Sequence, residues 1–227
     1  MKKIKLFGAA LGLMALMLAN TSQASLGTVV LTNHGGNANG GGLFQAVTSQ
    51  NGTFDTFCLS IPTTFYLGHT YYYDISSTIV ANGVPPAASY ITLGTAYIYS
   101  QFRAGNANYA GAGNANAVQA AIWYLQGDLN GYVDPENNVN LSTYVNSILT
   151  KVLADNPTWT LNSLTQNGNG YANVFAMNLY TTASTQGGYA QPQLFQAVPE
   201  PSTVIAGALM LLPFCISTLR ILRKSKV

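Results

Sequence analysis

Charge is scarce in this sequence. Of 227 residues, nine are Lys or Arg and seven are Asp or Glu. All of the cations except Arg103 and Lys151 lie close to the two ends of the chain. Over residues 25–199 six acidic residues accompany those two cations, so the formal charge is 2 − 6 = −4. A surface for binding nucleic acid is therefore excluded, because such binding depends on Lys and Arg contacts to phosphate.

Histidine and cysteine are also rare, with two of each in the chain. No group of His, Cys and carboxylate side chains has the spacing of a metal site, and no Ser-His-Asp arrangement is recognisable. We therefore predict no metal, no cofactor and no enzyme that turns over. His34 and His69 are expected to be strand or surface residues, although either is a candidate for assisting proton transfer.

Both ends of the chain have the pattern of export signals. Lysines near the start, an apolar run over 6–19 and small residues before position 25 predict a signal peptide at 1–24. Near the other end, a proline-bounded tripeptide precedes an apolar run over 204–219 and a basic tail. That run is long enough for a transmembrane helix whose basic end stays in the cytoplasm.

The order of these C-terminal features resembles the PEP-CTERM sorting signal of Gram-negative bacteria, with Pro199, Glu200 and Pro201 as its motif. The resemblance implies a sorting signal over 198–227 and an exosortase-type processing enzyme as a partner. It also implies export to the cell surface or extracellular matrix, after transient anchoring in the inner membrane. Residues 25–197 are then the extracellular domain.

The segment between the signals is rich in Gly, Asn, Thr, Ala and Tyr, which favours a β-rich extracellular domain. Alternating patterns predict strands over 26–32, 43–48, 53–61, 65–75, 158–164, 172–179 and 194–198. Helical spacing predicts helices over about 90–103, 116–126 and 142–154. The Gly/Asn-rich residues 33–42 are interpreted as a flexible loop.

These elements together predict an α+β fold. We expect a β-sandwich or barrel-like domain of antiparallel strands, with a two- to three-helix segment inserted at about 90–154. The signal peptide and the transmembrane helix flank this domain.

One thiol, Cys58, belongs to the predicted domain, because Cys215 falls in the predicted membrane helix. An unpaired cysteine in an exported protein suggests intermolecular pairing or a reactive role, and a buried inert thiol is the ordinary alternative. The helix predicted at 116–126 carries Gln119 near its start. A thiol held against such an amide can displace ammonia and leave a thioester, if the fold supplies proximity and excludes water.

Two segments resemble the paired motifs of thioester domains in bacterial surface adhesins: Phe57-Cys58-Leu59 and Val118-Gln119-Ala120-Ala121-Ile122-Trp123. The run over 95–102 also resembles the preceding helix of that family. The resemblance implies a Cys58–Gln119 thioester, with Phe57, Ile122 and Trp123 packed around the bond. Val118 departs from the Thr or Leu common before the glutamine, a change that leaves the reacting groups in place.

The function that this resemblance implies is single-use covalent capture. A nucleophile on a target displaces the sulfur, so the expected partners are polysaccharide hydroxyls or protein amines in adhesion or a biofilm matrix. The residues alone also allow a non-covalent structural or carbohydrate-binding β-sandwich protein of the extracellular matrix. In that alternative, tyrosines and asparagines contact the sugar, and Cys58 is an inert core residue.

Overall fold

The computed structural model describes residues 26–38, 41–80, 90–128, 141–185 and 188–198. The predicted signal peptide at 1–24 and the PEP-CTERM residues Pro199, Glu200 and Pro201 lie outside these ranges, as does the predicted transmembrane helix. Within the described residues, no helix is long and apolar enough to cross a membrane.

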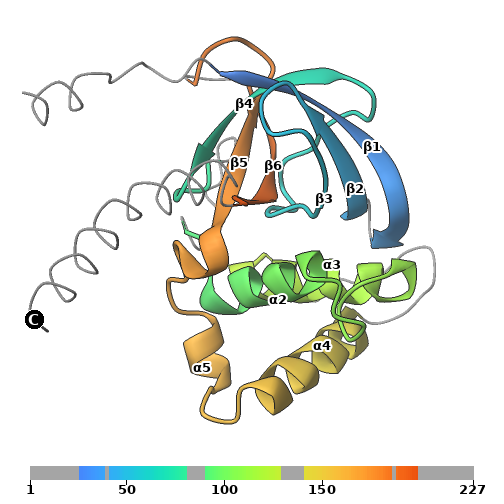
Figure 1. The fold of residues 1–227 in the computed structure, drawn as a ribbon, viewed down its shortest axis with the longest axis vertical. Helices are drawn as coiled ribbons and strands as arrows, with labels where there is room; N and C mark the ends of the chain where they lie inside the picture. Colours follow the sequence, from blue (N-terminus) through green and yellow to red (C-terminus); the bar gives the residue numbers. More distant parts are fainter. Residues whose placement is uncertain (1–25, 39–40, 81–89, 129–140, 186–187, 199–227) are drawn as a thin grey trace, which may run out of the picture.

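Six antiparallel strands form one sheet in the order β3-β2-β1-β4-β5-β6 (Figure 1). Their bounds are β1 Gly27–Ala38, β2 Gly41–Thr48, β3 Thr53–Thr56, β4 Thr70–Ser76, β5 Val174–Tyr180 and β6 Tyr189–Gln196. Buried and less buried residues alternate along β3, as expected for a strand with one face on the core. The sheet with its helices confirms the predicted α+β class.

The residues that follow β3 join the two edges of the sheet. The Leu59 N–H donates to the Pro192 carbonyl at 2.8 Å, and the Leu194 N–H donates to the Phe57 carbonyl at 3.0 Å. Cys58 lies between these contacts. The predicted strand over 53–61 is therefore too long, because β3 ends at Thr56 and the chain then turns to pair with β6 instead of β2.

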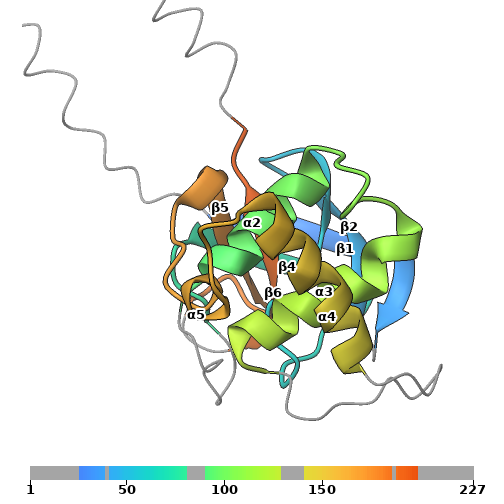
Figure 2. The same cartoon turned by 90° about the horizontal axis from the view of Figure 1, so that it is seen from below.

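Helices α2 (Leu93–Arg103), α3 (Ala112–Gln126) and α4 (Leu141–Asp155) lie between β4 and β5 in the sequence. They cover one end of the sheet: α2 and α3 lie next to the strands and α4 lies beyond them (Figures 1 and 2). The predicted helical insertion is confirmed. Helix α3 begins at Ala112, four residues earlier than expected.

The predicted strand over 158–164 is wrong. This segment contains the short helix α5 (Leu161–Leu164), followed by the 3₁₀ turn η2 (Tyr171–Asn173). The Thr160 side chain accepts from the Ser163 N–H, and the Ser163 side chain bonds back to the Thr160 backbone. This capping box stabilises a helical turn where the apolar pattern had suggested an extended chain.

The Gly/Asn-rich residues 33–42 do not form a loop throughout, because β1 continues to Ala38 and β2 begins at Gly41. Because the glycines of this hairpin have no side chains, its backbone lies directly against α3. A Cβ on Gly41 would stand 2.3 Å from the Trp123 ring, and one on Gly36 would stand 2.8 Å from the Ala115 Cβ. The glycines therefore serve close packing.

Buried side chains form two clusters that meet at Cys58. One includes Phe57 and Leu59 with Ile122 and other residues of the helices. The other includes Cys58 and Trp123 with side chains of the sheet. Successive side chains of an extended segment point to opposite sides, so Cys58 faces away from both of its neighbours.

Candidate functional site

The side-chain amide of Gln119 is hydrogen-bonded twice to the backbone of Cys58. Gln119 Oε1 accepts from the Cys58 N–H at 2.9 Å, and Gln119 Nε2 donates to the Cys58 carbonyl at 2.8 Å. Both residues have an exposed fraction of 0%. The structure thus places these two residues, 61 positions apart, in contact and fixes the orientation of the amide in a site closed to water.

Two further glutamines, both on β6, contact the Cys58 sulfur. The thiol donates to Gln191 Oε1 at 3.1 Å, and Gln193 Nε2 donates to Cys58 Sγ at 3.4 Å. Gln191 Nε2 in turn donates to the Ser60 carbonyl, which holds the Gln191 amide in place. The sulfur therefore has one acceptor for its proton and one donor directed at its lone pairs.

Burial raises the pKa of the Cys58 thiol to about 12, and the hydrogen bond from Gln193 acts in the opposite direction. The thiol is therefore protonated at neutral pH. Charge on the sulfur would be costly in this site, because few groups here can solvate an anion. Any reaction of the thiol must keep its proton nearby.

The sequence pattern did not indicate Gln191 or Gln193, because the last strand was expected to begin at Leu194. Their alternation around Pro192 was the available signal, since residues two apart on an extended chain share a face. Pro192 lies where the pairing of β5 with β6 changes register, so its missing N–H interrupts no regular ladder. The contact of Cys58 with Gln191 and Gln193 arises because the segment after β3 pairs with β6, and that pairing cannot be read from the sequence.

Helix α3 packs against the β1–β2 hairpin, and the residue after its C-terminal cap, Asp128, makes a second contact. Gly127 adopts a left-handed conformation that ends the helix, and Asp128 Oδ2 then accepts from the Ile61 N–H at 3.0 Å. Burial raises the pKa of Asp128, and the Ile61 N–H bond partly offsets this effect. This hydrogen bond joins the end of α3 to Ile61, which lies three residues after Cys58.

The three residues predicted to pack around the bond are all buried, but they lie on different sides of Cys58. Trp123 belongs to the cluster that contains the cysteine. Phe57 and Ile122 belong to the helix-side cluster, where the Phe57 ring packs edge-on against Phe102 at 4.9 Å. Trp123 is thus the one of the three that shares the apolar surroundings of the sulfur.

A pocket of about 250 Å³ shares Gln191 with the hydrogen bonds of the Cys58 sulfur, although Cys58 itself does not line it. Its lining residues are Phe44, Ile61, Thr63, Thr64, Phe65, Leu67, Trp123 and Gln191. Gln191 connects it to the site, because the same side chain lines the pocket and accepts the thiol hydrogen bond. Its rim is open to solvent at Thr64 and Leu67, which are exposed.

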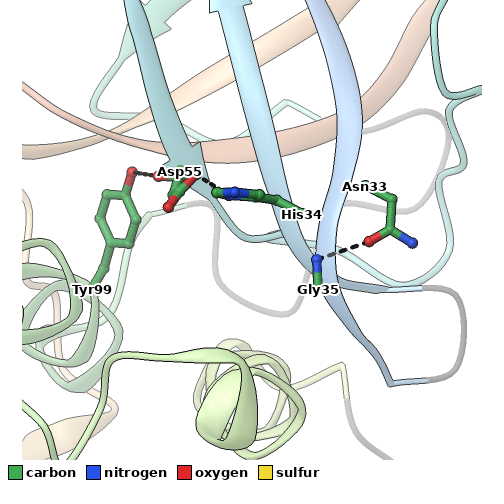
Figure 3. Close-up of polar contacts among 5 residues, drawn as sticks. All are labelled: Asn33, His34, Gly35, Asp55 and Tyr99. Atoms are coloured by element: carbon green, nitrogen blue, oxygen red, sulfur yellow. Dashed lines mark hydrogen bonds and ion pairs between the residues drawn. The ribbon is translucent and has the colours of Figure 1, made fainter.

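Neither histidine takes the role of a base beside the thiol in this arrangement. His34 Nδ1 donates to Asp55 Oδ1 at 2.7 Å, and the Tyr99 hydroxyl donates to the Asp55 backbone carbonyl at 2.8 Å (Figure 3). His34 and Asp55 line a separate pocket of about 600 Å³. The His69 ring lies 5.5 Å from the Tyr66 ring, centroid to centroid.

Among the described residues, no group of three or more His, Cys, Asp and Glu side chains is arranged to hold a metal ion. No protein-family model, curated protein or solved structure matches this chain. A function for the protein must therefore be inferred from its site, without the support of a relative.

Proposed function

We propose that this protein forms an internal thioester between Cys58 and Gln119 and uses it for the covalent capture of amines or hydroxyl groups. The observation that carries the proposal is the pair of hydrogen bonds between the Gln119 amide and the Cys58 backbone. Those bonds hold the amide of a buried glutamine against the backbone of the residue that carries the buried thiol. Proximity and orientation of this kind are what a slow reaction between thiol and amide requires.

Formation of the bond needs no other reactant. Cys58 Sγ adds to Gln119 Cδ, the C–N bond breaks, and the thiol proton leaves with the amide nitrogen as ammonia. The Cys58 N–H donates to Gln119 Oε1, where negative charge develops during the addition, and so acts as an oxyanion donor. Gln191 Oε1 accepts the thiol hydrogen bond and orients the proton before it is transferred.

The same surroundings preserve the product. A thioester hydrolyses when water reaches its carbonyl, and both reacting residues are fully buried here. The Trp123 ring and the hairpin at Gly41 cover the Gln119 side chain, because a Cβ on Gly41 would lie 3.1 Å from Gln119 Cγ. Hydrogen bonds to β6 on either side of Cys58, at Phe57 and Leu59, hold the segment that carries the cysteine.

Capture follows when an external nucleophile attacks Gln119 Cδ and the Cys58 sulfur leaves. The product is an amide or ester between Gln119 and the target, with the thiol restored. Since no step regenerates the glutamine amide, each molecule acts once and is not an enzyme. We place this chemistry in a protein exported through its signal peptide and sorted by its PEP-CTERM signal, at the cell surface or in a biofilm matrix.

The test of this proposal is capture that resists denaturant. The purified protein and its Cys58→Ala variant are incubated with a biofilm matrix preparation, which is then washed in guanidinium chloride. We expect the wild-type protein to remain attached and the variant to be removed. The matched control is Gln196→Ala on β6, where Gln196 Nε2 donates to the Ala172 carbonyl away from the sulfur.

A non-covalent carbohydrate-binding protein would behave differently in this test. It would bind the matrix equally well with and without Cys58, and denaturant would remove both forms. That outcome would contradict covalent capture.

A further inference from the structure

We propose that the chain carries a second, non-covalent site that binds an acidic sugar, a uronate with one carboxylate and several hydroxyl groups. The site is the pocket of about 600 Å³ between β3 and the C-terminal end of α2, which we call the His34 pocket. Its polar lining residues are His34, Gln45, Thr53, Asp55 and Arg103. The proposal does not depend on the thioester, because neither Cys58 nor Gln119 lines this pocket.

Three neighbouring strands place polar side chains at this pocket. Gln45 on β2 is directly opposite Asp55 on β3, so their side chains share one face of the sheet. On β1 the pairing with β2 shifts between Asn33 and Gly35, which makes His34 an extra residue at a β-bulge. Its Nδ1 lies 2.7 Å from Asp55 Oδ1 (Figure 3). Because a bulge redirects a side chain, a residue of β1 reaches β3 past the strand between them.

The polar residues of this lining are accessible, whereas its large apolar side chains are buried. All five polar lining residues are exposed or partly exposed. The buried apolar residues are Leu43, Phe54 and Phe102, with exposed fractions of 5%, 7% and 8%. A sugar ring combines hydroxyl groups with an apolar C–H face, so it matches both kinds of lining. A volume of about 600 Å³ is within the range of small-molecule sites.

Arg103 supplies the charge that selects a carboxylate. Its guanidinium carbon lies 5.5 Å from the centroid of the Phe54 ring. Within the described residues it forms no ion pair, and its Nη1 is buried without a hydrogen-bond partner. Partial burial of an unpaired cation costs free energy. A carboxylate bound in the pocket offsets that cost through its charge, and it need not contact Nη1 to do so.

The remaining polar groups suit the hydroxyls of such a ligand. An ionised carboxylate only accepts hydrogen bonds, and Asp55 can accept a hydroxyl donor in addition to His34. The Gln45 amide and the Thr53 hydroxyl can each donate and accept. An acidic peptide also offers a carboxylate to Arg103, but its side chains bring no hydroxyl donor for Asp55. The lining therefore favours a uronate over an acidic peptide.

The experiment compares three ligands by isothermal titration calorimetry of the purified protein. They are digalacturonate, its dimethyl ester and a blocked di-glutamate peptide. The ester keeps the sugar hydroxyls and removes the charge, whereas the peptide keeps two carboxylates and has no sugar hydroxyl. We expect digalacturonate to bind about ten-fold more tightly than either of the others, because only this ligand satisfies both Arg103 and Asp55.

Substitutions of the two cations test the role assigned to Arg103. Arg103→Gln should weaken the binding of digalacturonate by about ten-fold and leave the binding of the ester unchanged. Arg103→Lys keeps the charge without the planar fork and should restore part of the affinity. The matched control is Lys151→Gln, because Lys151 Nζ donates to the Asn108 carbonyl and does not line the pocket. This control should bind digalacturonate as the wild-type protein does.

Each other outcome overturns the proposal. Equal affinity of the wild-type protein for digalacturonate and its ester contradicts a carboxylate site, whether or not Arg103→Gln folds. Equal or tighter binding of the peptide assigns the pocket to acidic peptides and not to sugars. Equal losses in Arg103→Gln and Lys151→Gln show an effect of net charge alone, and no binding of any ligand removes the site. The thioester is tested separately, by the intact mass of the same samples.

Discussion

At the scale of single residues, the surroundings of the Cys58 sulfur differ from those of an ordinary buried cysteine. A buried structural cysteine needs only apolar neighbours, whereas Cys58 has three buried glutamines around its backbone and thiol. Burying an amide costs free energy unless its groups are bonded, and an apolar side chain would fill the same space without that requirement. The proposed thioester gives these glutamines a role that packing alone does not require.

The sequence identified part of this arrangement. Cys58 and Gln119 stand out because one is the lone thiol of its domain and the other is a glutamine in an apolar helix. Gln191 and Gln193 look like ordinary strand residues, since their partner is 133 or more positions away and only the closure of the sheet brings them to it.

The first prediction concerns Gln193, whose Nε2 donates to the Cys58 sulfur. Removing this donor in Gln193→Ala withdraws support from charge that develops on the sulfur, so we expect thioester formation to slow by about ten-fold or more. The measurement follows loss of ammonia by intact mass in freshly synthesised protein. Gln196→Ala on the same strand is the control, and equal rates for the two variants would show that Gln193 has no part in the reaction.

At the scale of secondary-structure elements, the β1–β2 hairpin packs against α3 beside the Gln119 side chain. Apolar residues such as Val118, Ile122 and Leu125 predicted a helix here, although α3 is buried on almost every side from Ala117 to Gln126 and begins earlier than expected. The hairpin was not predictable from its Gly/Asn-rich sequence, which is typical of loops. Its extended form depends on packing against Ala115 and Trp123, and that packing exists only in the folded domain.

The second prediction tests this contact through Gly41→Ala. The added methyl group would overlap the Trp123 ring, at 2.3 Å from Cη2, so the hairpin or the ring must move. We expect a loss of about 1–3 kcal/mol in the free energy of unfolding, as is typical for overpacking. Denaturant unfolding provides the measurement, and the yield of thioester should fall as well because Trp123 and Gln119 shift together.

Gly113→Ala is the matched control for this substitution. Gly113 lies in α3, and a Cβ there would meet no atom within 4 Å. Since Ala favours a helix over Gly, this variant should be more stable by about 0.5–1 kcal/mol. Equal stability of the two variants would contradict the close approach of the hairpin to α3.

At the scale of the whole molecule, the fold consists of a six-stranded antiparallel sheet with helices across one end. The α+β class and the helical insertion were predictable, because both follow from local patterns in the sequence. The pairing of the segment after β3 with β6 was not, because it joins residues that are far apart in the chain and leaves no periodic signal. This long-range closure is what brings Cys58 to Gln191 and Gln193.

The third prediction concerns stability at alkaline pH. Burial raises the pKa of Tyr99 to about 12 and also raises the pKa of Tyr109 and Tyr180, from an ordinary value of 10.0. The unfolded chain therefore releases these protons at lower pH than the folded one. Their stabilising contribution is present below pH 10 and is lost as the pH rises through 12.

Denaturant unfolding between pH 8 and pH 12 measures this loss. We expect the free energy of unfolding to fall in that interval, with a shallower slope in Tyr99→Phe. An unchanged slope in this variant would show that Tyr99 ionises at similar pH in the folded and unfolded states.

The mass of the intact protein tests the central claim most directly. Displacement of the Gln119 amide nitrogen by Cys58 removes one ammonia, so the purified protein should weigh ~17 Da less than its sequence requires. Cys58→Ala and Gln119→Ala should each show their full sequence mass, because either substitution removes one partner of the bond. A wild-type protein of full mass, with Cys58 alkylated after denaturation, would contradict the thioester.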